Sequence, residues 1–152
     1  MTRRPRTVSG AAGPGRIGVT LVPTVLLADA DADARNMMRD ALLEGTGPCD
    51  LRSVASVPEL EEYLGSGSPA LVVIDLDLPG ALDAVRTIKC NTALRRIPVV
   101  VLARHPEPND VHAAYEAGAN TLIPKPVTFL ALVKLIKVFT AYWLEAAALP
   151  RP

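Results

Sequence analysis

The chain has 152 residues, a length that suits one domain, and its 16 basic and 16 acidic residues give a formal net charge of zero. A hydrophobic content of 49% is typical of a globular protein, and no apolar run approaches the roughly 18 residues of a membrane span. We therefore expect a soluble, cytoplasmic protein. The two cysteines, Cys49 and Cys90, lack the spacing of a zinc site or a disulfide scaffold, so both are predicted to be buried, reduced thiols.

The first 23 residues differ in charge from the rest of the chain. They hold four of the arginines and no acidic residue, so the remainder carries a net charge of −4. The segment is rich in Gly, Pro, Ser and Thr, and it lacks the apolar core of a secretory signal. We predict a disordered basic tail over 1–23 and a folded domain over 24–150. The tail is either an arm for nucleic acid or an acidic partner, or an extension without contacts; four arginines are few for a nucleic-acid footprint.

Strands and helices alternate from Thr24 onward. Short apolar runs predict five strands, at 25–28, 51–54, 71–76, 99–102 and 121–123. Helically spaced apolar residues between turn signals predict helices at 34–44, 56–64, 81–90 and 110–117, and a last helix from 127 or 128 to Trp143. Apolar strands that alternate with helices imply an α/β fold with a parallel sheet covered on both faces.

Local signals support several of these helices. Ser56 and Glu59 have the spacing of a capping box, with Pro58 in the first turn. Gly118 stands where a left-handed helix cap is easiest. One apolar face is predicted for the last helix, from Phe129, Leu132, Val133, Ile136, Phe139, Thr140 and Trp143.

Two aspartates and a lysine follow predicted strands. Asp29 ends the first strand, Asp75 ends the third at its exposed carboxyl end, and Lys125 follows the fifth. The carboxyl ends of parallel strands lie along one edge, so these groups converge if the first, third and fifth strands are neighbours. Two carboxylates there suit Mg²⁺, and a lysine can meet a phosphoryl oxygen. The simpler alternative is that the aspartates cap helices and the lysine pairs with Asp75; three such residues at three strand ends favour a functional site.

From Thr24 to Pro150 the chain resembles the receiver domain of bacterial response regulators. The matching pieces are Leu27-Ala28-Asp29, residues 74–80 (IDLDLPG), Gly118-Ala119-Asn120 and Lys125-Pro126. A narrower likeness, to stand-alone regulators that partner phytochrome-type histidine kinases, depends on residues 97–102 (IPVVVL), Tyr142-Trp143-Leu144 and Leu149-Pro150.

The resemblance implies a (βα)5 doubly wound, flavodoxin-like fold with a five-stranded parallel sheet. It also implies that Asp75 accepts a phosphoryl group from a phosphohistidine on a sensor histidine kinase. Asp29 would be an acidic Mg²⁺ residue, Asp77 would offer its backbone carbonyl to the metal, and Lys125 would contact the phosphoryl group. The chemistry is nucleophilic, with positioning and charge neutralisation as its main sources of rate.

Three positions depart from the family's pattern. Ala30 replaces a second acidic residue after the first strand, with Asp31 as a candidate substitute because residues 29 and 31 share a side in extended backbone. Ala103 replaces a Ser or Thr after the fourth strand, and Leu122 replaces an aromatic switch residue. The loop after Asp75 is also about two residues shorter than usual. These changes weaken Mg²⁺ binding and remove a phosphoryl contact worth roughly 0.5–1.5 kcal/mol or more.

The expected protein is a signalling protein rather than an enzyme. No attached DNA-binding domain is expected, so output would pass through a partner protein or a homodimer. The surface of the fourth helix, fifth strand and last helix is the family's usual contact face. The main alternative is a degenerate pseudo-receiver that works as a phosphorylation-independent adaptor. A remote alternative is a phosphatase that uses Asp75 and Asp77 as a DxD motif. His105 and His112 lack further clustered ligands, so they are predicted to be surface residues rather than a metal site.

Overall fold

The structure is a computed structural model that describes residues 22–45 and 48–150. Residues 1–21 lie outside this part, so the disordered basic tail stays a prediction. Near the start of the described residues, the Pro23 carbonyl accepts a hydrogen bond from the Asp50 amide at 2.9 Å. This contact ties the start of the domain to a second segment of the chain.

The five predicted strands are confirmed, and they form one parallel sheet of order β2-β1-β3-β4-β5. Strands β3 and β4 are buried along their whole length because helices cover both faces of the sheet. The edge strand β2 is only half-buried. The strand bounds are β1 Thr24–Ala28, β2 Asp50–Val54, β3 Leu71–Asp75, β4 Val99–Ala103 and β5 Thr121–Pro124.

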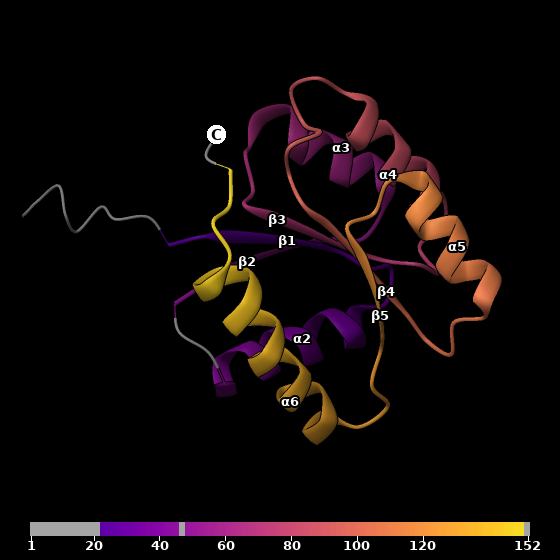
Figure 1. The fold of residues 1–152 in the computed structure, drawn as a ribbon. Helices are drawn as coiled ribbons and strands as arrows, with labels where there is room; N and C mark the ends of the chain where they lie inside the picture. The colour runs from indigo at the N-terminus through magenta and orange to yellow at the C-terminus, as the bar shows by residue number, and fades with distance from the viewer. Residues whose placement is uncertain (1–21, 46–47, 151–152) are drawn as a thin grey trace, which may run out of the picture.

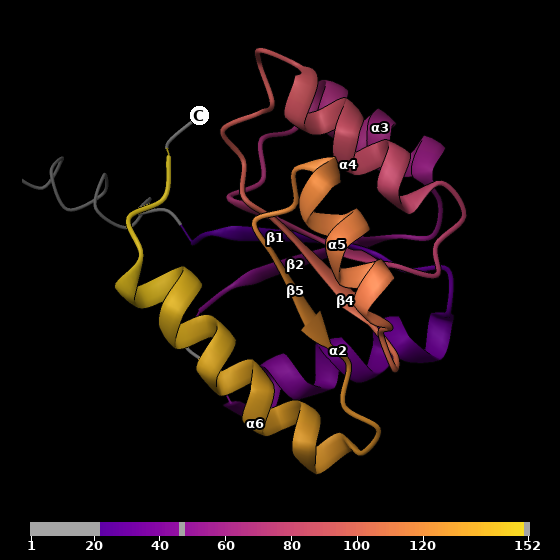
Figure 2. The same cartoon turned by 45° about the vertical axis from the view of Figure 1, so that its right-hand side comes forward.

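Five helices cover the two faces of this sheet. Figures 1 and 2 show α2 and α6 side by side on one face and α3, α4 and α5 on the other, as a doubly wound fold requires. The helix bounds are α2 Ala32–Gly45, α3 Val57–Ser66, α4 Ala81–Cys90, α5 Pro108–Ala117 and α6 Phe129–Thr140.

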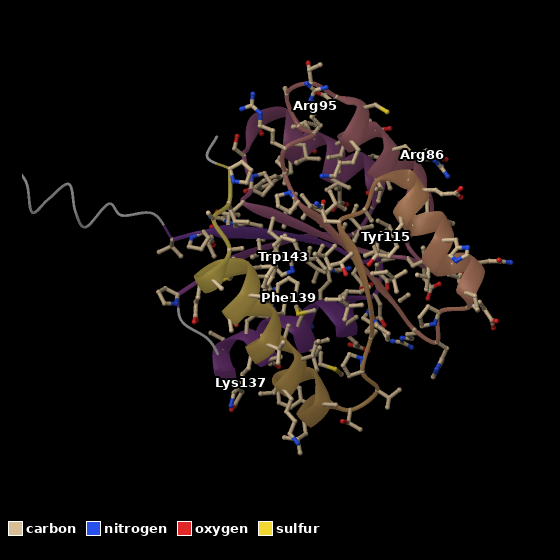
Figure 3. The ribbon with its side chains drawn as sticks, viewed as in Figure 1. Arg86, Arg95, Tyr115, Lys137, Phe139 and Trp143 are labelled. Atoms are coloured by element: carbon tan, nitrogen blue, oxygen red, sulfur yellow. The ribbon has the colours of Figure 1, made fainter. Side chains whose placement is uncertain are left out.

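Alternating side chains of the strands build two separate cores. In β3, Val72 and Ile74 pack toward the α3–α5 side, whereas Leu71 and Val73 pack toward α2 and α6. Figure 3 shows Phe139 on the side of α6 that faces the sheet and Lys137 beside the end of α2. The two-residue period therefore gives each strand a buried residue for both layers.

The last helix departs from the prediction at both ends. Phe129 is 41% exposed although it was expected on the apolar face. At the other end α6 stops at Thr140, and a π-helical turn, Ala141–Ala146, continues the chain. The Thr140 hydroxyl donates to the Ile136 carbonyl at 2.8 Å, and such a bond competes with the regular helical ladder. Trp143 remains half-buried against the core, with its ring centroid 5.0 Å from that of the exposed Tyr142.

Helix starts and ends account for most other differences. Helix α3 runs two residues past Leu64, through Gly65 and Ser66. Helix α5 begins at Pro108 rather than at Asp110. The Glu107 amide donates to the Asp110 carboxylate at 2.8 Å, and the Glu107 side chain caps the first turn in return. This capping box extends the helix by two residues.

The prediction that both cysteines are buried is wrong for Cys90, which is exposed at the end of α4. Cys49 is half-buried, and both thiols are free. Burial raises the pKa of the Cys49 thiol, with a smaller contribution from the negative charge of Asp50. Within residues 22–45 and 48–150, no helix is long and apolar enough to cross a membrane.

Candidate functional site

The carboxyl edge of the sheet holds both predicted aspartates. Asp75 is the last residue of β3, and Asp29 follows β1 directly. Strands β1 and β3 are hydrogen-bonded neighbours, with Ala28 opposite Ile74. The two carboxylates therefore start from adjacent positions at the same edge.

The condition stated for convergence is met only in part: β1 and β3 are neighbours, but β4 lies between β3 and β5. Lys125 reaches the aspartates across the end of β4. Its amide donates to the Ala103 carbonyl at 2.7 Å, which fixes the lysine backbone beside the last residue of β4. Its Nζ then donates to Asp29 Oδ2 at 2.8 Å and to Asp75 Oδ1 at 3.3 Å. The long lysine side chain makes the convergence possible without strand adjacency.

Both carboxylates are buried rather than exposed. Asp29 is 2% exposed and Asp75 is 7% exposed, so the strand end does not deliver Asp75 to open solvent. Burial raises the pKa of Asp75, and the negative charges of Asp29 and Asp77 raise it further, while Lys125 lowers it. One lysine is thus shared between two buried acids. The local charge is net negative, which favours a cation at this edge.

The Asp31 carboxylate accepts a hydrogen bond at the start of α2, and this bond competes with metal binding. Its amide donates to Asp29 Oδ1 at 2.9 Å, and its own Oδ1 accepts from the Asp33 amide at 2.9 Å. The Asp31 carboxylate therefore caps the start of α2. Ala30, between the two aspartates, is exposed and contributes no ligand oxygen from its side chain.

The Asp29 backbone is anchored by a residue that the sequence did not single out. Arg35 Nη1 donates to the Asp29 carbonyl at 2.7 Å, and the Asp29 amide donates to the Val54 carbonyl at 3.1 Å. These bonds hold the turn that carries the Asp29 carboxylate toward Lys125. The only signal in the sequence is the separation of six residues, which is not specific.

The turn after β3 carries the remaining predicted metal residue. Asp77 is exposed there, and the Leu78 amide closes the turn by donating to the Asp75 carbonyl at 3.0 Å. Gly80 then adopts φ +82°, a left-handed conformation that costs glycine little, and α4 begins at the next residue. The short loop therefore passes directly from the phosphoacceptor candidate into a helix.

The oxygen ligands at this edge fit Mg²⁺, although they are fewer than a site with a third acid would offer. Mg²⁺ is commonly held by one or two carboxylates, with waters and phosphate oxygens completing its shell. Asp29 and Asp75 supply two carboxylates, and the exposed turn at Asp77 offers a peptide carbonyl. No group of three or more His, Cys, Asp or Glu side chains suited to a metal occurs in the described part of the chain. The protein therefore offers fewer anionic ligands than a site with a third acid at position 30.

Two other positions of interest lie near this edge. Ala103, at the end of β4, is 1% exposed and has only a methyl group, and Leu122 on β5 packs as a half-buried residue against the α3–α5 core. His105 and His112 are both exposed, and they form no metal cluster with other residues that the structure describes. His105 is nevertheless unusual, because its φ is +45°.

A parallel sheet of this strand order, with ligand groups at its carboxyl edge, defines the flavodoxin-like class of doubly wound proteins. Within this class, the family described as "Response regulator receiver domain" matches residues 25–137. The match spans most of the chain, so the chain belongs to the response regulator receiver family.

Individual relatives agree with this assignment. The chain is 32% identical to the response regulator Rcp1 of Synechocystis sp. over 135 residues, which cover 83% of this chain and 91% of Rcp1. The crystal structure of the phosphorylated cyanobacterial phytochrome response regulator RcpA superposes with a TM-score of 0.79 at 26% identity, covering 86% of this chain and 100% of RcpA. The Mn²⁺-bound form of Rcp1 gives a TM-score of 0.76 at 27% identity, with coverage of 85% and 99%.

Proposed function

We propose that this protein is a response regulator that accepts a phosphoryl group on Asp75 from a sensor histidine kinase. One observation carries the proposal: the buried Asp75 carboxylate lies beside Asp29 and shares the Lys125 ammonium with it. A carboxylate that is partly desolvated and held by a fixed cation is oriented for nucleophilic attack. Family membership supplies the donor, a phosphohistidine.

The transfer assigns a separate task to each side chain. An Asp75 carboxylate oxygen attacks phosphorus, an O–P bond forms, and the N–P bond to the donor imidazole breaks with its electron pair left on nitrogen. Lys125 Nζ, 3.3 Å from Asp75 Oδ1, stabilises negative charge on the transferred group. Asp29 positions that ammonium through its 2.8 Å contact. Bound Mg²⁺, held by Asp29, Asp75 and the Asp77 carbonyl, would supply charge neutralisation at the phosphoryl oxygens.

The proposed partner is a phytochrome-type histidine kinase in the cytoplasm. This part of the proposal rests on the similarity to RcpA, which is described as a phytochrome response regulator. Output is proposed to pass through the α5–β5–α6 surface, by contact with a partner protein or a second copy. Several large apolar side chains at α6 are exposed there, which suits a protein contact.

A second candidate function is an adaptor that works without phosphorylation. It is favoured by Ala30 and Ala103, because the first removes a metal ligand and the second removes a phosphoryl contact. Lys125 already pairs with both aspartates, so part of their negative charge is neutralised without a metal ion or a phosphoryl group. The adaptor would use the same exposed surface in one constant conformation.

Intact mass measurement after incubation with phosphoramidate and Mg²⁺ separates these functions. We expect the wild type to gain the mass of one phosphoryl group and Asp75→Asn to gain none. Asp83→Asn is the matched control, because it changes an exposed carboxylate on α4 that pairs only with Arg86 among the described residues, so it should react like the wild type. An unmodified wild type would favour the adaptor. Hydrolysis of small phosphate esters that Asp77→Asn abolishes would instead indicate a phosphatase.

A further inference from the structure

The β4–α5 loop, residues 104–107, leaves the sheet where the site lacks a hydroxyl. It follows the buried Ala103, whose carbonyl is held by the Lys125 amide at 2.7 Å. The next residue, Arg104, is exposed. Its guanidinium has no hydrogen bond or ion pair within residues 22–45 and 48–150. A cation without a partner among the described residues therefore follows the last residue of β4.

The strand register places Arg104 within reach of Asp75. Asp75 pairs with Leu102 across β3 and β4, so Arg104 is two residues beyond that pair. Neighbouring strands are about 4.8 Å apart and each residue advances about 3.3 Å, which separates the two Cα atoms by roughly 8 Å. An extended arginine side chain covers most of that distance. A phosphoryl group on Asp75 would extend toward it.

The backbone after Arg104 is strained. His105 adopts φ +45°, the only non-glycine residue with positive φ among those the structure describes. The left-handed conformation is unfavourable for a side chain with a Cβ, and the following Pro106 favours extended backbone instead. Strained residues that persist tend to cluster at ligand sites, where the surrounding structure enforces them. Here the Lys125–Ala103 bond precedes the strained residue and the α5 capping box follows it.

The negative charge at this edge would exceed what Lys125 can neutralise, so a second cation would be favoured there. A phosphoryl group would add negative charge beside Asp29 and Asp77, and Lys125 is shared between Asp29 and Asp75. Arg35 is already engaged, since it donates to the Asp29 carbonyl at 2.7 Å. Arg104 can offer two parallel N–H groups to phosphoryl oxygens, a geometry that matches phosphate closely.

We propose that Arg104 is a phosphoryl-binding residue of this protein, in place of the hydroxyl that Ala103 cannot supply. The left-handed turn at His105 keeps the arginine at the rim of the site. The inference rests on the proposed phosphorylation of Asp75. It also offers an explanation for how a chain with Ala103 could retain a phosphoacceptor site.

Beryllofluoride, a stable mimic of a phosphoryl group on a carboxylate, provides the test. Its affinity is measured calorimetrically with Mg²⁺ for the wild type, Arg104→Ala and Arg104→Lys. We expect Arg104→Ala to weaken binding about tenfold, the loss typical of a charge-assisted hydrogen bond, and Arg104→Lys to recover part of it. Arg96→Ala, an exposed arginine in the α4–β4 loop, is the matched control and should bind like the wild type. Adding Ala103→Thr to Arg104→Ala should restore affinity.

The outcomes distinguish this inference from the function on which it rests. Binding by the wild type together with equal or tighter binding by Arg104→Ala overturns the role of Arg104 and leaves Asp75 as phosphoacceptor. Absence of binding and of phosphorylation in the wild type overturns both. If Arg96→Ala weakens beryllofluoride binding as much as Arg104→Ala does, the loss comes from the change in net charge, and the specific contact of Arg104 is overturned. Unchanged thermal midpoints of the free variants exclude misfolding as the cause of lost affinity.

Discussion

At the scale of single residues, Asp75 is held where its negative charge costs stability. It is 7% exposed, and it faces the carboxylate of Asp29 while sharing Lys125. Burial, supported by Asp29 and Asp77, raises its pKa above the ordinary value of 3.8. The folded protein therefore binds this proton more tightly than the unfolded chain does. Ionisation of Asp75 opposes folding at neutral pH.

Removing the ionisable group at Asp75 should therefore stabilise the folded protein at neutral pH. Asp75→Asn should raise the free energy of unfolding at pH 7, by on the order of 1 kcal/mol. The gain should shrink as the pH falls through the raised pKa of folded Asp75, and it should vanish below 3.8, where the carboxyl is neutral in both states. Urea unfolding between pH 3 and 7 measures this. Glu62→Gln, on the exposed side of α3, should show no such pH-dependent gain, and an equal gain in both variants would contradict the prediction.

At the scale of secondary-structure elements, the connection from α5 to β5 depends on one backbone conformation. Gly118 caps α5 with φ +107°, where side chains are rarely tolerated. A Cβ there would lie 2.8 Å from Cγ of Lys89, whose Nζ donates to the carbonyls of Arg95 and Ile97 at 3.2 and 2.7 Å. Burial also lowers the pKa of Lys89. Gly118 thus lets the lysine join α4 to the following loop.

Gly118→Ala should therefore destabilise the fold by about 1 to 3 kcal/mol, because backbone strain and a displaced Lys89 add together. Gly65→Ala is the matched control. Gly65 lies inside α3, and apart from its chain neighbours and the backbone of its own helix nothing lies within 4 Å of an added Cβ, so alanine there should stabilise by roughly 0.5–1 kcal/mol. Thermal unfolding followed by circular dichroism compares the two. An unchanged or raised thermal midpoint for Gly118→Ala would show that Gly118 is not conformationally required.

The strands could be predicted from the sequence because each is a short apolar run between turn residues, and runs such as 71–75 have few alternative structures. Helix ends were harder. Glutamate is an uncommon N-cap, so the Glu107–Asp110 capping box gives no clear signal in the sequence, and the predicted start at Asp110 falls two residues after the observed one. The π-helical turn follows Thr140, whose side chain bonds the Ile136 carbonyl, and no periodicity reveals that bond.

The convergence of Asp29, Asp75 and Lys125 could be predicted from strand ends on the condition that their strands are neighbours, and it occurs although β4 separates β5 from β3. The sequence does not predict which partner each carboxylate oxygen contacts. An aspartate after a strand can bind a metal or cap the next helix, and only the 2.9 Å bond from the Asp33 amide assigns Asp31 to the helix. Burial of Asp75 likewise depends on the packing of neighbouring loops, which local sequence does not specify.

At the scale of the whole molecule, the outer side of α6 carries exposed apolar residues beside the exposed Lys134 and Lys137. Leu130, Val138 and Tyr142 are 66%, 69% and 57% exposed. Leu130 and Val138 lie on α6 with the exposed Lys134 between them, and Tyr142 follows in the π-helical turn. Single exposed apolar residues are common, but three of them along α6 and the turn that continues it, called the α6 row below, suit a protein contact.

We expect this row to mediate self-association once Asp75 is modified, and Val138→Glu should weaken that association about tenfold or more. Burying a valine contributes roughly 1.5–3 kcal/mol, and a buried unpaired carboxylate adds a further cost. Sedimentation velocity with Mg²⁺ and beryllofluoride measures the dissociation constant. Leu43→Glu, at a 79% exposed position on α2, is the control and should associate like the wild type. Because both sites are exposed, neither substitution should change folding stability by more than about 0.5 kcal/mol. A wild type that stays monomeric with beryllofluoride bound would contradict this prediction.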